Sequence, residues 1–244
     1  MNRKKFIESS LLGTLSLGLI PKSLQYNLLN DISYQELIGK GNPELYGNGY
    51  KIRRVAHLAF EKMVSAAKNS GIEIQSVSSY RSFKRQNQIW ERKFLTNQQK
   101  GLSPINNLKK IIEYSTIPGT SRHHWGTDLD LIDISVNRPA RVLQPKHFND
   151  GGCFRNFKLW MDQHANSYGF HLVYTDTKDR KGFKYEPWHY SYKPLSSEYL
   201  KAYRKLDLNT LINSENIKGN QYFTKKFIAD YIEHNILDIN PALL

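Results

Sequence analysis

The stretch Ser121–Asp130, SRHHWGTDLD, most constrains what this chain can fold into. It gathers two histidines, a glycine and two aspartates, and imidazole nitrogen and carboxylate oxygen are ligands that zinc accepts. His123 and Asp130 lie seven residues apart, so on one helix they would be about 10 Å apart along the axis, too far to hold one ion. We therefore predict a turn that brings His123 to a strand carrying Asp130.

The residues that follow favour such a strand. Leu129–Ile134, LDLIDI, roughly alternates apolar and acidic residues, as a half-buried strand does. A catalytic zinc ion usually has three protein ligands and one open position, so a third ligand must come from elsewhere. His189 is the best candidate, and Glu186, three residues earlier, could serve as a general base. Spacing alone does not make this assignment specific.

At these residues the chain resembles the zinc D-alanyl-D-alanine peptidases of the VanY and VanX type, within the LAS group of metallopeptidases. SRHHWGTDLD is similar to the family signature S-x-H-x-x-G-x-x-x-D, and EPWHY resembles its E-x-W-H element. A third segment, SSYRS with Gln86 five residues after Arg81, resembles the pattern S-x-Y-R-S-x-x-x-Q. The three motifs occur in the family's order, and the resemblance covers residues 52–192.

The resemblance implies a role for each matching residue. It makes His123, Asp130 and His189 the ligands of one zinc ion per chain, and Glu186 the catalytic acid/base. Arg81, which on sequence alone would be taken for a surface salt bridge, falls on the arginine that contacts the substrate or the oxyanion. A guanidinium suits this role because it stays charged and binds a carboxylate as a fork. Substrate contacts are expected from the remaining motif residues Ser121, Gln86, Asp128, Tyr80 and Trp188.

Two residues of the metal loop depart from this simple picture. Asp128 stands where many members of the family have alanine, and in an extended strand it shares a face with Asp130. We expect it to contact either a zinc ligand or a substrate amine. His124, next to His123, is the other histidine worth testing, although lone histidines are more often hydrogen-bonded structural groups.

The fold that the resemblance implies is α+β, with a small antiparallel sheet that carries the zinc site and packs against helices. Residue periodicity predicts helices and strands along the chain. We divide the sequence into a signal peptide or N-terminal anchor at 1–22, a linker at 23–49, a zinc peptidase domain at 50–195 and a C-terminal helical extension at 196–244. The extension either packs on the domain or binds a partner. The helices are expected at 51–69, 83–97, 106–114, 154–167, 196–206 and 222–236, and the strands at 72–78, 129–134, 170–174 and 183–192.

The first 22 residues have a basic head followed by an apolar stretch at 11–20. This is the pattern of a secretory signal, and it is too short to span a membrane comfortably. No clean small-residue cleavage site follows, so retention as a membrane anchor remains an alternative. The pattern predicts export to the periplasm or cell envelope of a bacterium.

The net charge of +13 fits nucleic acid, an anionic membrane surface or acidic cell-wall material as a partner. The bases are spread without a dense run and no nucleic-acid motif is present, so we expect no specific nucleic-acid partner. The resemblance implies hydrolysis of peptidoglycan peptides next to D-alanine. Two alternatives stay open, a non-catalytic zinc-containing module that binds cell-wall peptide or protein, and a peptidoglycan endopeptidase. The sequence does not set the oligomeric state.

Overall fold

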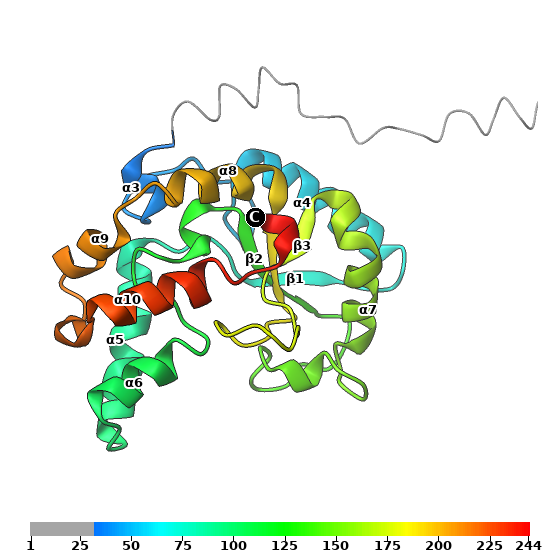
Figure 1. Ribbon diagram of the computed structural model, residues 1–244. Helices are drawn as coiled ribbons and strands as arrows, with labels where there is room; N and C mark the ends of the chain where they lie inside the picture. Colours follow the sequence, from blue (N-terminus) through cyan, green and yellow to red (C-terminus); the bar gives the residue numbers. More distant parts are fainter. Residues whose placement is uncertain (1–31) are drawn as a thin grey trace, which may run out of the picture. The chain divides into compact units, whose positions relative to one another are not determined.

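The computed structural model describes residues 32–244, and Ser33–Leu244 form one compact unit (Figure 1). Within this part of the chain the strands form a four-stranded antiparallel sheet in the order β1-β2-β4-β3. The sheet and its surrounding helices confirm the expected α+β class. The expected signal peptide or anchor at 1–22 lies outside the described residues, and no helix described is long and apolar enough to cross a membrane.

The strands are β1 (Ile74–Ser78), β2 (Asp128–Asp133), β3 (Phe170–Leu172) and β4 (His189–Tyr192). The three predictions at 72–78, 129–134 and 170–174 are confirmed with small shifts of their ends. The predicted strand at 183–192 is wrong over its first six residues. There the His189 N–H donates to the Glu186 carbonyl at 3.0 Å, and Pro187 between them has no N–H to give to a neighbouring strand.

Two helices, α4 (Arg54–Lys68) and α7 (Arg155–His164), cover one face of the sheet (Figure 1). Apolar residues recur every three or four positions along α4, so one side of that helix can be buried. Side chains alternate along a strand, and Asp128 and Asp130 of β2 and His189 and Ser191 of β4 therefore point to the opposite face. The core joins Ala56, Phe60, Met63 and Ala67 of α4 and Phe157, Trp160 and Met161 of α7 to Leu129, Leu131, Tyr190 and Tyr192 of the sheet.

On the other side, Figure 1 shows α5 (Phe83–Gln99), α6 (Pro104–Ile111), α9 (Leu208–Ser214) and α10 (Lys225–Tyr231). A π-helical turn, Ile232–Ile236, continues α10. The helices predicted at 83–97, 106–114 and 222–236 are confirmed with shifted ends, and α8 (Lys193–Tyr203) replaces the prediction at 196–206. Helix α9 was not predicted, because its seven residues are too few to show a clear period.

Residues 33–49 are not the linker that the sequence analysis expected. They include α3 (Tyr34–Leu37), and Leu37 is buried with its carbonyl accepting a hydrogen bond from Trp125 Nε1 at 3.2 Å. Gly39 has a φ of +78° and lies so close to His124 that an added Cβ would be 2.3 Å from Nδ1. This segment therefore packs directly against the loop that carries the histidines.

The C-terminal residues pack on the same loop from another side. Tyr203 of α8 donates its hydroxyl to the Gly119 carbonyl at 2.8 Å. Tyr231 of α10 accepts a hydrogen bond from the Ile117 N–H at 3.1 Å and shares one with Thr120 Oγ1 at 2.7 Å. Of the two arrangements considered for 196–244, the structure shows packing on the domain.

Candidate metal centre and active site

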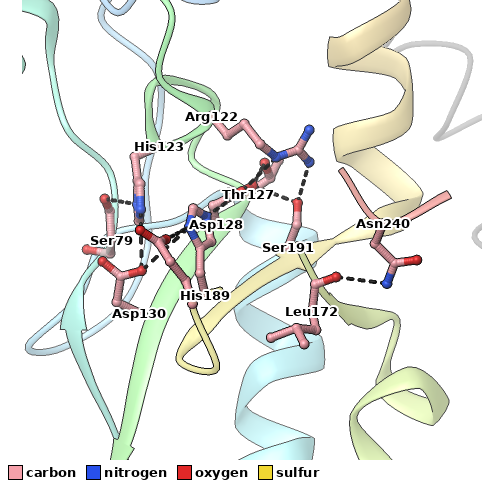
Figure 2. Close-up of polar contacts among 11 residues, drawn as sticks. Ser79, Arg122, His123, Thr127, Asp128, Asp130, Leu172, His189, Ser191 and Asn240 are labelled. Atoms are coloured by element: carbon pink, nitrogen blue, oxygen red, sulfur yellow. Dashed lines mark hydrogen bonds and ion pairs between the residues drawn. The ribbon is translucent and has the colours of Figure 1, made fainter. Parts of the chain in front are cut away.

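Three side chains converge above the polar face of the sheet (Figure 2). Asp130 of β2 and His189 of β4 are direct partners in the strand register, and His123 comes from the 3₁₀ helix Arg122–Trp125 just before β2. Gly126 ends that helix with a φ of +70°, which lets the chain turn back into the strand. One potential ligand atom from each of the three residues lies within 4.8 Å of the other two. The predicted turn into a strand thus brings the expected ligands together.

The spacing of these atoms suits a tetrahedral metal ion. His123 Nε2 is 3.6 Å from Asp130 Oδ1, and His189 Nδ1 is 3.8 Å from the same oxygen. Ligands that bind zinc tetrahedrally at about 2.1 Å are roughly 3.4 Å from one another. His123 Nε2 and Asp130 Oδ1 are both buried and have no hydrogen-bond partner within residues 32–244. Burying such atoms unpaired is costly, so these two point to a cation as their missing partner.

Hydrogen bonds set the face that each histidine presents. His123 Nδ1 lies 2.8 Å from the Ser79 carbonyl, to which it donates, and this leaves the Nε2 lone pair free. His189 Nε2 lies 3.0 Å from Asp128 Oδ2, so Nδ1 is the nitrogen that faces Asp130 and Glu186. Metal-binding histidines are commonly oriented in this way. Burial lowers the pKa of His123 to about 4, with Arg81 adding to the effect, so the ring is neutral as a ligand must be.

Asp128 does not contact the substrate amine, one of the two roles expected from the sequence. Its side chain is fully buried, and its oxygens accept hydrogen bonds from Arg122 Nε, His189 Nε2, Thr127 Oγ1 and Ser191 Oγ (Figure 2). Burial alone would raise the pKa of Asp128, but Arg122 and His189 outweigh it and hold the pKa well below its usual range. Asp128 is therefore an ionised group that orients a metal-binding histidine.

Glu186 lies beside the ligands. Its Oε2 is 3.0 Å from His189 Nδ1, because the turn before β4 folds Glu186 back toward that residue. Burial raises the pKa of Glu186, the Asp130 charge adds to this rise, and His189 opposes it. For His189, burial is outweighed by hydrogen bonds to Asp128 and Glu186, which raise its pKa to about 9. The carboxylates around His189 thus favour a positive charge at the point where the three ligands meet. The Glu186 carboxylate beside them is suited to proton transfer.

Arg81 reaches the same region from the end of β1. Its Nη1 donates to Gln86 Oε1 at 2.8 Å, and Gln86 Nε2 donates to the Thr116 carbonyl at 2.8 Å. Gln86 is completely buried and does not line the cavity, so the expected substrate contact is corrected to a positioning role. Arg81 Nε is buried without a hydrogen-bond partner among the residues described, which leaves it available to a ligand.

His124 fixes the backbone of Arg81. Its Nδ1 is 2.6 Å from the Arg81 carbonyl, and its Nε2 accepts a hydrogen bond from the Gly119 N–H at 3.2 Å. The Arg81 N–H in turn donates to the His123 carbonyl at 3.1 Å. Burial lowers the pKa of His124 to about 3, so the ring is neutral. Both of its nitrogens are bonded to the backbone, which makes it a structural group.

A cavity of about 420 Å³ opens at this cluster, and the remaining predicted residues divide around it. Ser121 and Trp188 line it, and Ser121 Oγ is buried without a hydrogen-bond partner within residues 32–244. Tyr80 is missing from the lining as the structure describes it. The substrate contact expected of Tyr80 stays a prediction.

Three further cavity residues were not predicted. Tyr174 packs edge-on against His189 with ring centroids 5.1 Å apart, and Arg122 holds Asp128 through an ion pair at 3.0 Å. Lys93 of α5 also lines the cavity. Tyr174 lies 15 residues from His189, and Lys93 lies on a helix outside the three motifs, whereas Arg122 stands inside the metal loop six residues before Asp128 and could have been considered as its partner.

A site with two histidines, an aspartate and an adjacent glutamate on a small antiparallel sheet defines a metal-dependent hydrolase. The family model for VanY, described as D-alanyl-D-alanine carboxypeptidase, matches residues 49–195. The chain belongs to this family, as the sequence motifs predicted.

Curated relatives agree with this placement. A putative carboxypeptidase YodJ of Bacillus subtilis is 31% identical over 142 residues, covering 58% of this chain and 46% of the relative. A D-alanyl-D-alanine carboxypeptidase of Enterococcus faecalis is 24% identical over 173 residues, covering 70% of this chain and 59% of the relative. An uncharacterised protein of Haemophilus influenzae is 30% identical over 105 residues, covering 42% of this chain and 80% of that protein.

Solved structures show the same fold. A VanY D,D-pentapeptidase variant from a VanB-type resistance cassette, in complex with Zn(II), superposes with a TM-score of 0.51 at 23% identity. That match covers 66% of this chain and 83% of the other. VanYB in complex with D-alanine-D-alanine gives a TM-score of 0.52 at 22% identity, covering 72% of this chain and 92% of the other.

Proposed function

We propose that the protein is a zinc-dependent carboxypeptidase that removes the terminal D-alanine from peptidoglycan peptides ending in D-alanyl-D-alanine. One zinc ion per chain would be held by His123 Nε2, Asp130 Oδ1 and His189 Nδ1. The observation that carries the proposal is the position of Glu186 in the same cavity, with Oε2 3.0 Å from His189 Nδ1. Family membership and the substrates named for its relatives support this choice.

Zinc, when bound, supplies Lewis acidity that polarises a carbonyl oxygen and makes water a better nucleophile near neutral pH. Glu186 accepts the proton of the attacking water and then delivers it to the amine nitrogen that leaves. Its raised pKa suits both halves of that transfer, and a well-placed acid/base contributes roughly 10²- to 10⁴-fold to the rate. Surrounding aromatic side chains, Tyr174 and Trp188 among them, limit the access of bulk water to this proton path.

Arg81 has the position and charge to stabilise the oxyanion that develops on the scissile carbonyl. Gln86 and the backbone bonds to His123 and His124 hold the guanidinium in place before the substrate arrives. A donor that is pre-oriented in this way stabilises the transition state without reorganising during the reaction. Ser121 Oγ, buried at the cavity wall, is suited to hydrogen-bond the substrate backbone.

We propose further that the chain is exported and that residues 1–22 serve as its signal peptide or membrane anchor. The basic head and the apolar stretch at 11–20 support this proposal. Peptidoglycan is assembled outside the cytoplasm, which places the substrate on the same side. Fractionation of cells that make the full chain tests it, and recovery of all the protein in the cytosol would contradict export.

Mass spectrometry of a synthetic muropeptide ending in D-alanyl-D-alanine tests the activity. We expect the zinc-loaded protein to shorten the peptide by one alanine, and addition of a chelator to stop the reaction. Cleavage at an internal bond would instead identify an endopeptidase. With zinc bound at one equivalent, an intact peptide after long incubation would contradict hydrolysis and favour the binding module.

A further inference from the structure

The cavity carries a second cation besides Arg81. Lys93 lies on α5 seven residues after Gln86, which is two helical turns along the same face. Gln86 accepts a hydrogen bond from Arg81 Nη1, so the Arg81 guanidinium lies against the first turns of α5, and Lys93 is about 10 Å farther along the same helix. Ile89 also lines the cavity and fills the turn between them. Both basic side chains line the same cavity, one near the start of α5 and the other two turns later.

Lys93 has no carboxylate partner in the part of the chain that the structure describes. Lys184, by comparison, pairs with Glu113 at 3.1 Å, and Arg122 pairs with Asp128 at 3.0 Å. The Lys93 ammonium is partly desolvated, and this burial lowers its pKa. The Arg81 charge lowers the pKa further, and the Glu186 charge raises it. A cation kept in such a place without a partner gains from a ligand that brings a negative charge.

The net charge of the site with zinc bound also favours a ligand that carries a negative charge. A zinc ion bound by Asp130 carries one net positive charge, and Glu186 compensates it. Arg81 and Lys93 then remain uncompensated, since Arg122 is neutralised by Asp128. A substrate with one free carboxylate compensates one of these two positive charges, whereas an internal segment of a neutral peptide compensates neither.

We propose that Lys93 recognises the C-terminal carboxylate of the residue that is removed, and so makes the site selective for chain ends over internal bonds. This inference rests on the proposed function and refines it. Arg81 lies beside the metal ligands, where charge develops on the carbonyl, and Lys93 lies farther along α5. An ammonium pairs with a carboxylate as a compact point charge, and its flexible stem can follow the terminal group.

The test is equilibrium binding to zinc-loaded protein with the Glu186→Gln substitution, which prevents turnover during titration. The probes are N-acetyl-L-lysyl-D-alanyl-D-alanine with a free carboxylate and its C-terminal amide. We expect Lys93→Met to weaken binding of the acid roughly 10- to 100-fold, the size typical of a lost charged hydrogen bond, and to change binding of the amide less than 2-fold. Lys93→Arg should restore most of the loss.

Arg92→Met is the matched control. Arg92 is exposed on the same helix and outside the cavity, so this variant loses the same charge without losing the contact. Its affinity for the acid should stay within 2-fold. Equal losses for acid and amide in Lys93→Met, or no loss for either, would overturn the proposal.

A third probe separates two sources of carboxylate. It has an amidated C-terminus and a free α-carboxylate on a γ-D-glutamyl residue earlier in the peptide. If Lys93→Met weakens binding of this probe and not of the free acid, the terminal assignment is wrong. The binding measurement also separates the two claims. A protein that hydrolyses neither peptide but binds the acid more tightly only when Lys93 is present would refute the activity and support the recognition.

Discussion

His189 of β4 and Asp128 of the neighbouring strand β2 form a buried hydrogen bond, in which Nε2 of the imidazole donates to Oδ2 of the carboxylate at 3.0 Å. The same carboxylate is held by Arg122, and the histidine's other nitrogen faces Asp130 and Glu186. The pair decides which nitrogen of His189 is available to a metal.

Asp128→Asn should weaken zinc binding by about 10- to 100-fold, the usual effect of losing a partner that orients a metal-binding histidine. The neutral amide accepts the His189 proton less strongly and leaves Arg122 without its ion pair. Competition with a chelator measures the affinity. Asp133→Asn is the control, because Asp133 is also buried in β2 but accepts from the backbone N–H groups of Glu73 and Ser135. Equal zinc affinity in both variants would contradict the role of Asp128.

Gln86→Leu should lower kcat/KM by about 10- to 100-fold while zinc content stays unchanged, because Arg81 loses the acceptor that fixes its guanidinium. Steady-state kinetics with zinc analysis checks this. Gln88→Leu is the matched control, since Gln88 is exposed on the same helix and contacts only Arg85 among its described hydrogen bonds. A Gln86→Leu enzyme with normal kinetics would show that Arg81 needs no support.

Gly39→Ala should destabilise the fold by more than about 2 kcal/mol, because the new Cβ would lie 2.3 Å from His124 Nδ1 as well as requiring a strained backbone. Gly71→Ala separates the two effects. Gly71 has a similar φ of +75° and nothing within 4 Å, so its cost should be close to 1 kcal/mol from strain alone. Urea unfolding gives both values. Equal costs would mean that residues 33–49 do not support the metal loop.

Stability should fall as the pH rises above 10. Burial raises the pKa of Tyr199 to about 12, and it also raises the pKa of Tyr203 and of Tyr231. Unfolded tyrosines lose their protons near pH 10, so the unfolded state is favoured as the pH passes that value, while the full contribution is present below it. For each such group the loss approaches about 1.4 kcal/mol per pH unit between pH 10 and 12.

Urea unfolding of the metal-free chain at pH 8, 9, 10 and 11 measures this dependence. Tyr203→Phe should flatten the decline, and at pH 8 it should cost about 1 kcal/mol through the lost bond to the Gly119 carbonyl. A free energy of unfolding that stays constant from pH 9 to 11 would contradict the burial of these hydroxyls.

The sequence predicted the ligands and Glu186 because each stands in a short contiguous motif whose spacing survives folding. His123 and Asp130 occupy one loop and strand, and Glu186 and His189 occupy one turn. The strand prediction also placed Asp130 on a rigid support. Residues that act together within one short segment can therefore be predicted from the local sequence pattern.

The roles of the supporting residues could not be predicted, because they depend on partners far along the chain. Asp128 meets Ser191 and His189 more than 60 residues away, and Gln86 meets Thr116 across 30 residues. The segment 33–49 was taken for a linker because its few apolar residues show no period, although Leu37 is buried.

The central claim is that Glu186 transfers protons beside a zinc ion held by three other residues. The most direct measurement is the rate of D-alanine release from a D-alanyl-D-alanine peptide by the native protein and by Glu186→Gln, at equal zinc content. We expect about 10²- to 10⁴-fold slower release in the variant with zinc still bound. Similar rates for the two proteins, each carrying its zinc, would contradict it.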